Sequence, residues 1–121
     1  MAQYEPKTVN SLDETNPLTD AIEATFTAPF AFSSIAVAAV DTEGNPVSAS
    51  GGAATVEIKT TVNPFYENLN DDAGSQISLD FTAPVTRVAS EAPVTAVRVT
   101  PDGNLAGTGV AGYQLSVDQY R

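Results

Sequence analysis

Carboxylates, tyrosines and a few amines are the only side chains in this sequence that suit acid–base or nucleophilic chemistry. The 121 residues include no cysteine and no histidine. Thiolate nucleophiles, disulfides, Ser-His-Asp triads and the usual zinc sites all need one of those two side chains. The sequence therefore predicts a protein that is not an enzyme and that has no catalytic residues, no cofactor and no bound metal.

Two acidic turns come closest to a metal site. Asn70, Asp71 and Asp72, with Glu67 nearby, offer the oxygen ligands that Ca²⁺ prefers. Residues 41–45, DTEGN, lack the later glutamate and the flanking helices of an EF-hand. Because neither spacing matches a defined calcium loop, we interpret both segments as solvated turns.

Two carboxylates suffice for glycoside hydrolysis, so the acidic residues are also candidates for a glycosidase pair. A catalytic acid usually lies in an apolar environment that raises its pKa. Asp80 is the one carboxylate within a strongly apolar segment, and the alternation of that segment points it outward. The sequence therefore gives no support for a glycosidase.

Phe65 and Tyr66 are adjacent aromatic residues in a turn-rich, acidic segment, residues 63–74. Rings in such a loop can stack on sugars, with neighbours such as Asn63 and Glu67 supplying hydrogen bonds. Alternatively, the two rings plug an open end of the fold, and this is the interpretation that we favour. Phe65 and Tyr66 are the candidate ligand platform.

The charge balance excludes another class of partner. Fifteen acidic residues against five basic ones give a net charge of −10. The basic residues are scattered singly: Lys7, Lys59, Arg87, Arg98 and Arg121. A nucleic-acid site needs a basic patch that displaces counterions, so we predict no nucleic-acid binding. The longest nearly uncharged run, residues 25–40, is shorter than the roughly 20 apolar residues that span a bilayer, so we expect a soluble protein without a membrane partner.

Short segments of alternating apolar and polar residues run through the chain, a period typical of β-strands with one buried face. We predict strands at residues 18–26, 34–40, 55–62, 77–81, 85–88, 97–100 and 113–117. No window has a helical apolar stripe, and glycine or proline interrupts every candidate. Six alternating residues are expected to share one core: Val56, Ile58, Leu79, Phe81, Val99 and Leu115.

This pattern indicates an all-β fold, a single-domain antiparallel β-sandwich with an extended N-terminal arm. Seven or eight short strands with turn signals about ten residues apart suit a jelly roll or an immunoglobulin-like sandwich, and the sequence leaves both open. Residues 94–117 read as two strands around a glycine-rich turn that begins with Pro101-Asp102-Gly103-Asn104, which predicts a hairpin.

The N-terminal residues 1–17 are polar and are expected to form the arm, with the sandwich domain at residues 18–121. Residues 34–40 are apolar on both faces. Either this segment is a central strand, or the arm or a neighbouring subunit covers its alanine-lined face. The candidate partner contacts are Tyr4, Val9, Ala36, Ala38 and Val40.

The arm MAQYEPKTVNSLDETNP, the apolar strand SIAVAAV and the sandwich pattern over residues 18–121 together resemble small structural proteins of tailed-phage virions, notably capsid decoration or cement proteins. The resemblance implies synthesis in the host cytoplasm and a final place on the capsid surface. There an oligomeric sandwich would contact the major capsid protein or other virion proteins and bridge neighbouring subunits. A carbohydrate-binding sandwich and a tail or fibre accessory domain are the alternatives.

Overall fold

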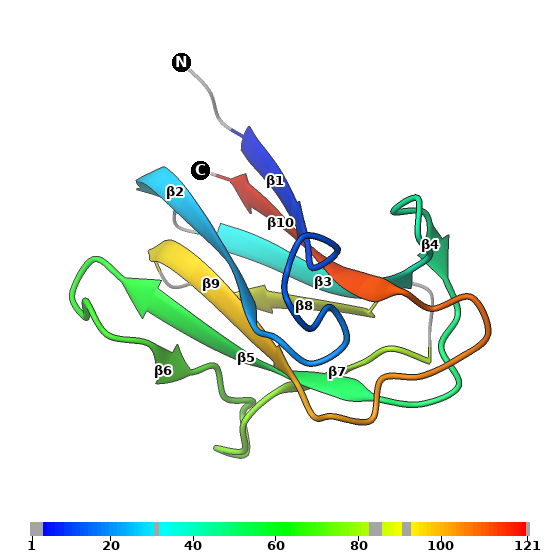
Figure 1. The fold of residues 1–121 in the computed structure, drawn as a ribbon. Helices are drawn as coiled ribbons and strands as arrows, with labels where there is room; N and C mark the ends of the chain where they lie inside the picture. The colour runs from blue at the N-terminus through cyan, green and yellow to red at the C-terminus, as the bar shows by residue number, and fades with distance from the viewer. Residues whose placement is uncertain (1–3, 31, 83–85, 91–92, 121) are drawn as a thin grey trace.

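The computed structural model describes residues 4–30, 32–82, 86–90 and 93–120. These residues form strands, turns and loops, with no helix among them (Figure 1). In chain order the strands are β1 (Tyr4–Asn10), β2 (Ile22–Phe30), β3 (Phe32–Val40), β4 (Pro46–Val47), β5 (Ala53–Thr60), β6 (Glu67–Asn68), β7 (Ser78–Asp80), β8 (Thr86–Ser90), β9 (Val94–Pro101) and β10 (Gly112–Tyr120).

The strands form two antiparallel sheets that pack face to face (Figure 1). Sheet A has the order β1-β10-β3-β4, and β8 also pairs with β3. Sheet B has the order β2-β9-β5-β6, and β7 also pairs with β5. The predicted all-β sandwich is therefore confirmed.

The pairing of the strands is nested and distinguishes the two topologies that the sequence left open. β1 pairs with β10, β2 with β9, β3 with β8, and β5 with β7. Such nesting arises when one long hairpin is rolled into two sheets, which is the jelly-roll arrangement. In an immunoglobulin-like sandwich the last two strands would lie in the same sheet.

The predicted hairpin over residues 94–117 is wrong, because its two strands lie in different sheets. β9 belongs to sheet B and β10 to sheet A, and residues 102–111 cross between the sheets. The turn signal itself was correct, since Gly103 has a φ of 89° and the Asn104 N–H donates to Asp102 Oδ1 at 2.9 Å. Beyond that turn the Leu105 side chain is buried in the core. The chain therefore continues across the core to the other sheet and does not turn back beside β9.

The core lies between the two sheets and contains all six residues predicted for it. The largest of the fully buried side chains are Tyr113 and Phe81, whose rings meet edge to face with centroids 5.5 Å apart. Alternation along β5 and β10 sends every second side chain into this core. The predicted strand parity is confirmed within β5 and β10.

Part of the expected arm is an edge strand of the sandwich. β1 pairs with β10 along its whole length, so the two ends of the described chain lie side by side (Figure 1). Val9 is half-buried and packs against the core. An edge strand needs few apolar residues because backbone hydrogen bonds hold one side of it, which is why its composition resembled that of a free arm.

β3 is the centre of sheet A, with β10 on one side and β8 and β4 on the other. Ala36, Ala38 and Val40 are buried within this single chain, and Ala36, the most exposed of them, retains 5% of its surface. β1 lies at the edge of the sheet beside β10 and not on that alanine-lined face. The structure thus favours the central-strand interpretation of residues 34–40.

Two predicted strands are displaced along the chain from the observed ones. β5 ends at Thr60 and not at residue 62, because Thr60 and Asn63 exchange backbone hydrogen bonds that reverse the chain. β2 begins at Ile22 and not at residue 18, because the amides of Thr19 and Asp20 donate to the carbonyl of Asn16 in a turn. Local turns therefore delay the start of β2 and end β5 early.

Candidate functional site

Three charged residues form a row across the outer face of sheet B. Glu23 on β2 lies opposite Arg98 on β9, and Arg98 lies opposite Glu57 on β5. The Arg98 guanidinium donates to Glu57 Oε1 from Nε at 3.2 Å and from Nη2 at 2.9 Å. Opposite charges placed directly across antiparallel strands stabilise the pairing modestly. This row therefore contributes to the pairing of β2, β9 and β5.

Tyr66 lies over this row. Its hydroxyl donates to Glu23 Oε2, and the Arg98 guanidinium carbon lies 4.1 Å from the ring centroid. The Lys59 Nζ lies 4.6 Å from the same centroid. The ring is therefore held by two cations and one carboxylate.

The surroundings of Tyr66 keep its hydroxyl protonated. Burial, followed by the hydrogen bond to Glu23, raises the pKa of the Tyr66 hydroxyl well above its usual range. A phenol with a raised pKa is a poor base or nucleophile near neutral pH. The cluster around Tyr66 therefore has the properties of a support for the sheet face and for the loop before it.

Phe65, the neighbour of Tyr66, has the opposite environment. Its side chain is 76% exposed, and that of Val62 is 88% exposed. The Phe65 N–H donates to Asn63 Oδ1 at 3.0 Å, while Asn63 Nδ2 donates to Glu67 Oε2 at 3.1 Å. We call residues 62–65 the apolar loop, since it presents two apolar side chains to solvent on a hydrogen-bonded backbone.

Neither ring plugs an end of the sandwich, so the interpretation favoured from the sequence is wrong. Phe65 projects into solvent, and Tyr66 covers the outer face of sheet B. Sequence reasoning also missed Val62, because the strand predicted over residues 55–62 included it and gave it the same face as Val56 and Ile58. The signal available was Asn63-Pro64, a turn dipeptide directly after it.

The two acidic turns share one geometry. In residues 41–45 the Asp41 Oδ1 accepts the N–H groups two and four residues on, and in residues 71–75 Asp71 does the same. Gly44 and Gly74 have φ values of 83° and 85° and donate to the aspartate carbonyls, as in a type I turn with a glycine bulge. The described residues contain no group of three acidic side chains placed to hold a metal ion.

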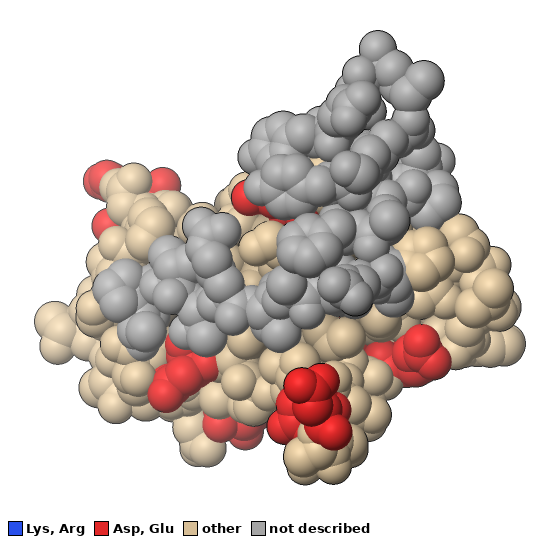
Figure 2. All heavy atoms as spheres, turned by 180° about the vertical axis from the view of Figure 1, so that it is seen from behind, with Lys and Arg blue, Asp and Glu red and all other residues tan. Residues whose placement is uncertain are grey.

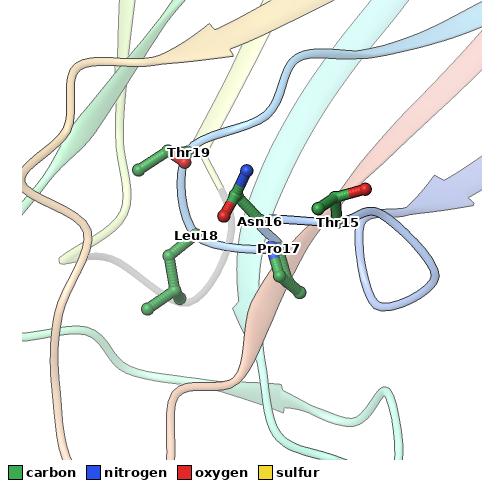
Figure 3. Close-up of a pocket in the computed structure, with 5 residues that line it drawn as sticks. All are labelled: Thr15, Asn16, Pro17, Leu18 and Thr19. Carbon is green, nitrogen blue, oxygen red and sulfur yellow. The ribbon is translucent and has the colours of Figure 1, made fainter.

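A shallow hollow lies between β1 and β2 and is lined by Thr15, Asn16, Pro17, Leu18 and Thr19 (Figure 3). All five residues belong to one loop, and none is charged. Leu18 is 36% exposed at this place. An active site needs convergent titratable groups, and this hollow contains none.

Acidic side chains lie in several separate places on the face of the molecule shown in Figure 2. Within the described ranges, no helix is long and apolar enough to cross a membrane. The most distinctive feature of the described surface is the apolar loop, where Val62 and Phe65 are exposed.

The residues expected to contact a partner occupy different places in the fold. Val9 is half-buried at the edge of sheet A, and Ala36, Ala38 and Val40 are buried in β3. The side chain of Tyr4 lies outside the described residues. The structure therefore does not bring them together as an exposed surface.

No protein-family model, curated protein or solved structure matches this chain.

Proposed function

We propose that this protein is a non-enzymatic structural protein of a virion, a capsid decoration or cement protein that binds the shell and bridges neighbouring subunits. The observation that carries the proposal is the exposed apolar loop, residues 62–65, on an acidic jelly roll. Jelly rolls are common in viral capsid proteins and in lectins, so this fold suits a virion protein and a carbohydrate-binding protein. The resemblance of the sequence to small virion proteins favours the virion protein.

Val62 and Phe65 are the proposed contacts with the shell. Exposed aromatic and aliphatic side chains act as anchors when a partner offers a pocket for them. Asn63 donates one hydrogen bond to Glu67 and accepts one from the Phe65 N–H, and these two bonds restrain the loop before binding, which lowers the entropy lost on contact. A repetitive shell presents many equivalent sites, so oligomers with one modest contact per copy could bind it by avidity.

The arm is not the proposed tether, because residues 4–10 form β1 within the sandwich. Pro6 lacks an amide proton, and Lys7 lies opposite Val117 on the inward side of this edge strand. Proline and inward-pointing lysine are features that hinder strand addition at sheet edges. The Lys7 Nζ also donates to the Thr25 carbonyl of β2 at 2.7 Å, which links the two sheets there.

The proposal is tested by particle occupancy. Virus particles from the source should be purified on a density gradient and the copies of this protein per particle counted by quantitative mass spectrometry. Phe65→Ala and Val62→Ser should each reduce occupancy when stripped particles are refilled with purified variants. Leu18→Ala is the matched control, because it truncates an exposed apolar side chain in the loop between β1 and β2. Absence of the protein from particles, or undiminished occupancy by both loop variants, would overturn the proposal.

A carbohydrate-binding module is the second candidate. It is favoured by the 76% exposed ring of Phe65, which has the polar side chains of Asn63 and Glu67 beside it. A glycan array probed with the intact protein and with Phe65→Ala distinguishes the two. Sugar binding that disappears in the variant, without particle binding, would favour the module.

A further inference from the structure

The turn that follows β9 contains the only Asp-Gly dipeptide in the sequence, Asp102-Gly103. An aspartate can be attacked at its side-chain carbonyl carbon by the amide nitrogen of the next residue, which closes a five-membered succinimide ring. Any side chain on that next residue hinders the attack. Glycine has none, so Asp102 is the aspartate at which this ring closes most readily.

The surroundings of this peptide unit are open. Asp102, Gly103 and Asn104 are all exposed, and a β-carbon placed on Gly103 would meet no atom within 4 Å. Among the described residues, the Gly103 N–H has no hydrogen-bond acceptor, whereas the Asp102 N–H donates to the Ala53 carbonyl at 2.9 Å. The attacking nitrogen is thus unhindered and unengaged, while the residue that it attacks is anchored.

We propose that Asp102-Gly103 is a site of spontaneous backbone modification in the folded protein, at which Asp102 converts to isoaspartate. The Gly103 nitrogen loses its proton and bonds to Asp102 Cγ, and one carboxyl oxygen of Asp102 leaves as water. Water then opens the ring at either carbonyl. Opening at the main-chain carbonyl leaves the chain running through Cγ, with a free α-carboxylate. This inference is independent of the proposed function.

Asparagine can close the same ring with loss of ammonia, but three asparagines in the turns and loops of this protein cannot. Asn16, Asn45 and Asn63 each precede a proline. Proline has no N–H, so its nitrogen cannot supply the attacking group. These three asparagines are therefore protected from imide formation by the proline that follows each of them. Asp102 has no such protection, because the residue that follows it is glycine.

One feature of the turn slows the reaction. The Asn104 N–H donates to Asp102 Oδ1 at 2.9 Å, and this bond lowers the pKa of the Asp102 carboxyl. A carboxylate is a weaker electrophile than a neutral carboxyl group. The modification should therefore accelerate as mildly acidic pH protonates Asp102.

Three other aspartates supply internal controls. Asp41, Asp71 and Asp80 each accept the N–H two residues on, as Asp102 does. The residues that follow them are Thr42, Asp72 and Phe81, all with side chains. These positions share that hydrogen bond with Asp102 but lack glycine at the next position. At Asp80 the nitrogen that would attack, that of Phe81, also donates to the Gly52 carbonyl at 3.0 Å, so Asp41 and Asp71 are the closer controls.

The test is prolonged incubation of the intact folded protein at mildly acidic and at neutral pH, followed by peptide mapping and isoaspartyl methyltransferase labelling. We expect isoaspartate to accumulate at residue 102 several-fold faster than at Asp41, Asp71 or Asp80, and faster at the lower pH. Asp102→Ser is the matched control, because its hydroxyl can keep the turn but cannot form the imide. It should abolish the labelling.

Two results would overturn the proposal. The first is isoaspartate at residue 102 only in guanidinium-unfolded chains, with none in folded protein under the same incubation. The second is accumulation at Asp41, Asp71 or Asp80 as fast as at residue 102, which would show that Gly103 does not decide the site.

Discussion

Ser11 and Tyr113, which are 102 positions apart, exchange hydrogen bonds just beyond the end of β1. The Tyr113 N–H donates to Ser11 Oγ at 2.9 Å, and the Ser11 N–H donates to the Tyr113 carbonyl at 2.9 Å. Ser11 Oγ also donates to the Pro17 carbonyl at 2.6 Å. A β-carbon on Gly112 would lie 2.7 Å from Ser11 Oγ, so glycine is needed there. This contact ties the loop between β1 and β2 to β10.

We therefore predict that Ser11→Ala destabilises the protein. The substitution keeps the β-carbon but leaves the Tyr113 N–H and the Pro17 carbonyl without their partner, at a cost of about 1–3 kcal/mol. Urea unfolding followed by circular dichroism measures this loss. Thr8→Ala is the control, because the Thr8 hydroxyl pairs with Ser116 at 3.3 Å on the exposed side. Equal stability of the two variants would show that the Ser11 contact is not important for folding.

The sequence was a good guide to strands and core because both depend on local alternation. Val56 and Leu115 were placed in the core from the period of two, and both are fully buried. Alternation does not reveal which strands are neighbours. β9 and β10 are consecutive and alternate clearly, yet they lie in different sheets.

The candidate site was less predictable for the same reason. Phe65 and Tyr66 were identified as a pair, but their opposite environments depend on residues distant in sequence. Glu23 and Arg98 reach Tyr66 only because β2 pairs with β9 in one particular register. No local pattern in the chain specifies that register.

Leu115→Ala should cost about 2–5 kcal/mol, because the side chain is fully buried between the sheets and its loss leaves a cavity. The neighbouring Gln114→Ala, on the outer face of β10, should change stability by less than about 0.5 kcal/mol. Chemical unfolding of both variants tests the assignment of faces. Similar losses at the two positions would mean that the parity of β10 is wrong.

Gly52→Ala should be more destabilising than Gly74→Ala. Both glycines have positive φ, 107° and 85°, so each substitution strains the backbone by about 1–2 kcal/mol. At Gly52 the new β-carbon would also lie 2.6 Å from the Leu105 Cα, whereas at Gly74 it would meet nothing within 4 Å. The clash should add about 1–3 kcal/mol.

The difference in the free energy of unfolding between Gly52→Ala and Gly74→Ala measures the cost of the steric clash with Leu105. If the two variants were equally stable, the segment that crosses between the sheets would have room to move away from Gly52.

Raising the pH should destabilise the fold through Tyr66 and Tyr113. Burial is the main cause that raises the pKa of each hydroxyl above its ordinary value of 10.0. Above pH 10.0 the tyrosines of the unfolded chain ionise while these two remain protonated in the folded protein. Their contribution to stability is therefore complete below that pH and is lost as the pH rises above it.

Two measurements check this alkaline behaviour: the free energy of unfolding across the alkaline range, and tyrosinate absorbance of the folded protein over the same range. We expect stability to fall with rising pH, and Tyr66→Phe to fall less steeply than the parent because one late-ionising hydroxyl is gone. Tyr113→Phe should act in the same direction, but it also removes the hydrogen bond from the Tyr113 hydroxyl to the Asp20 carbonyl and so lowers stability at neutral pH. If every tyrosine ionised near 10.0 while circular dichroism still showed the native sandwich, the burial of these two hydroxyls would be contradicted.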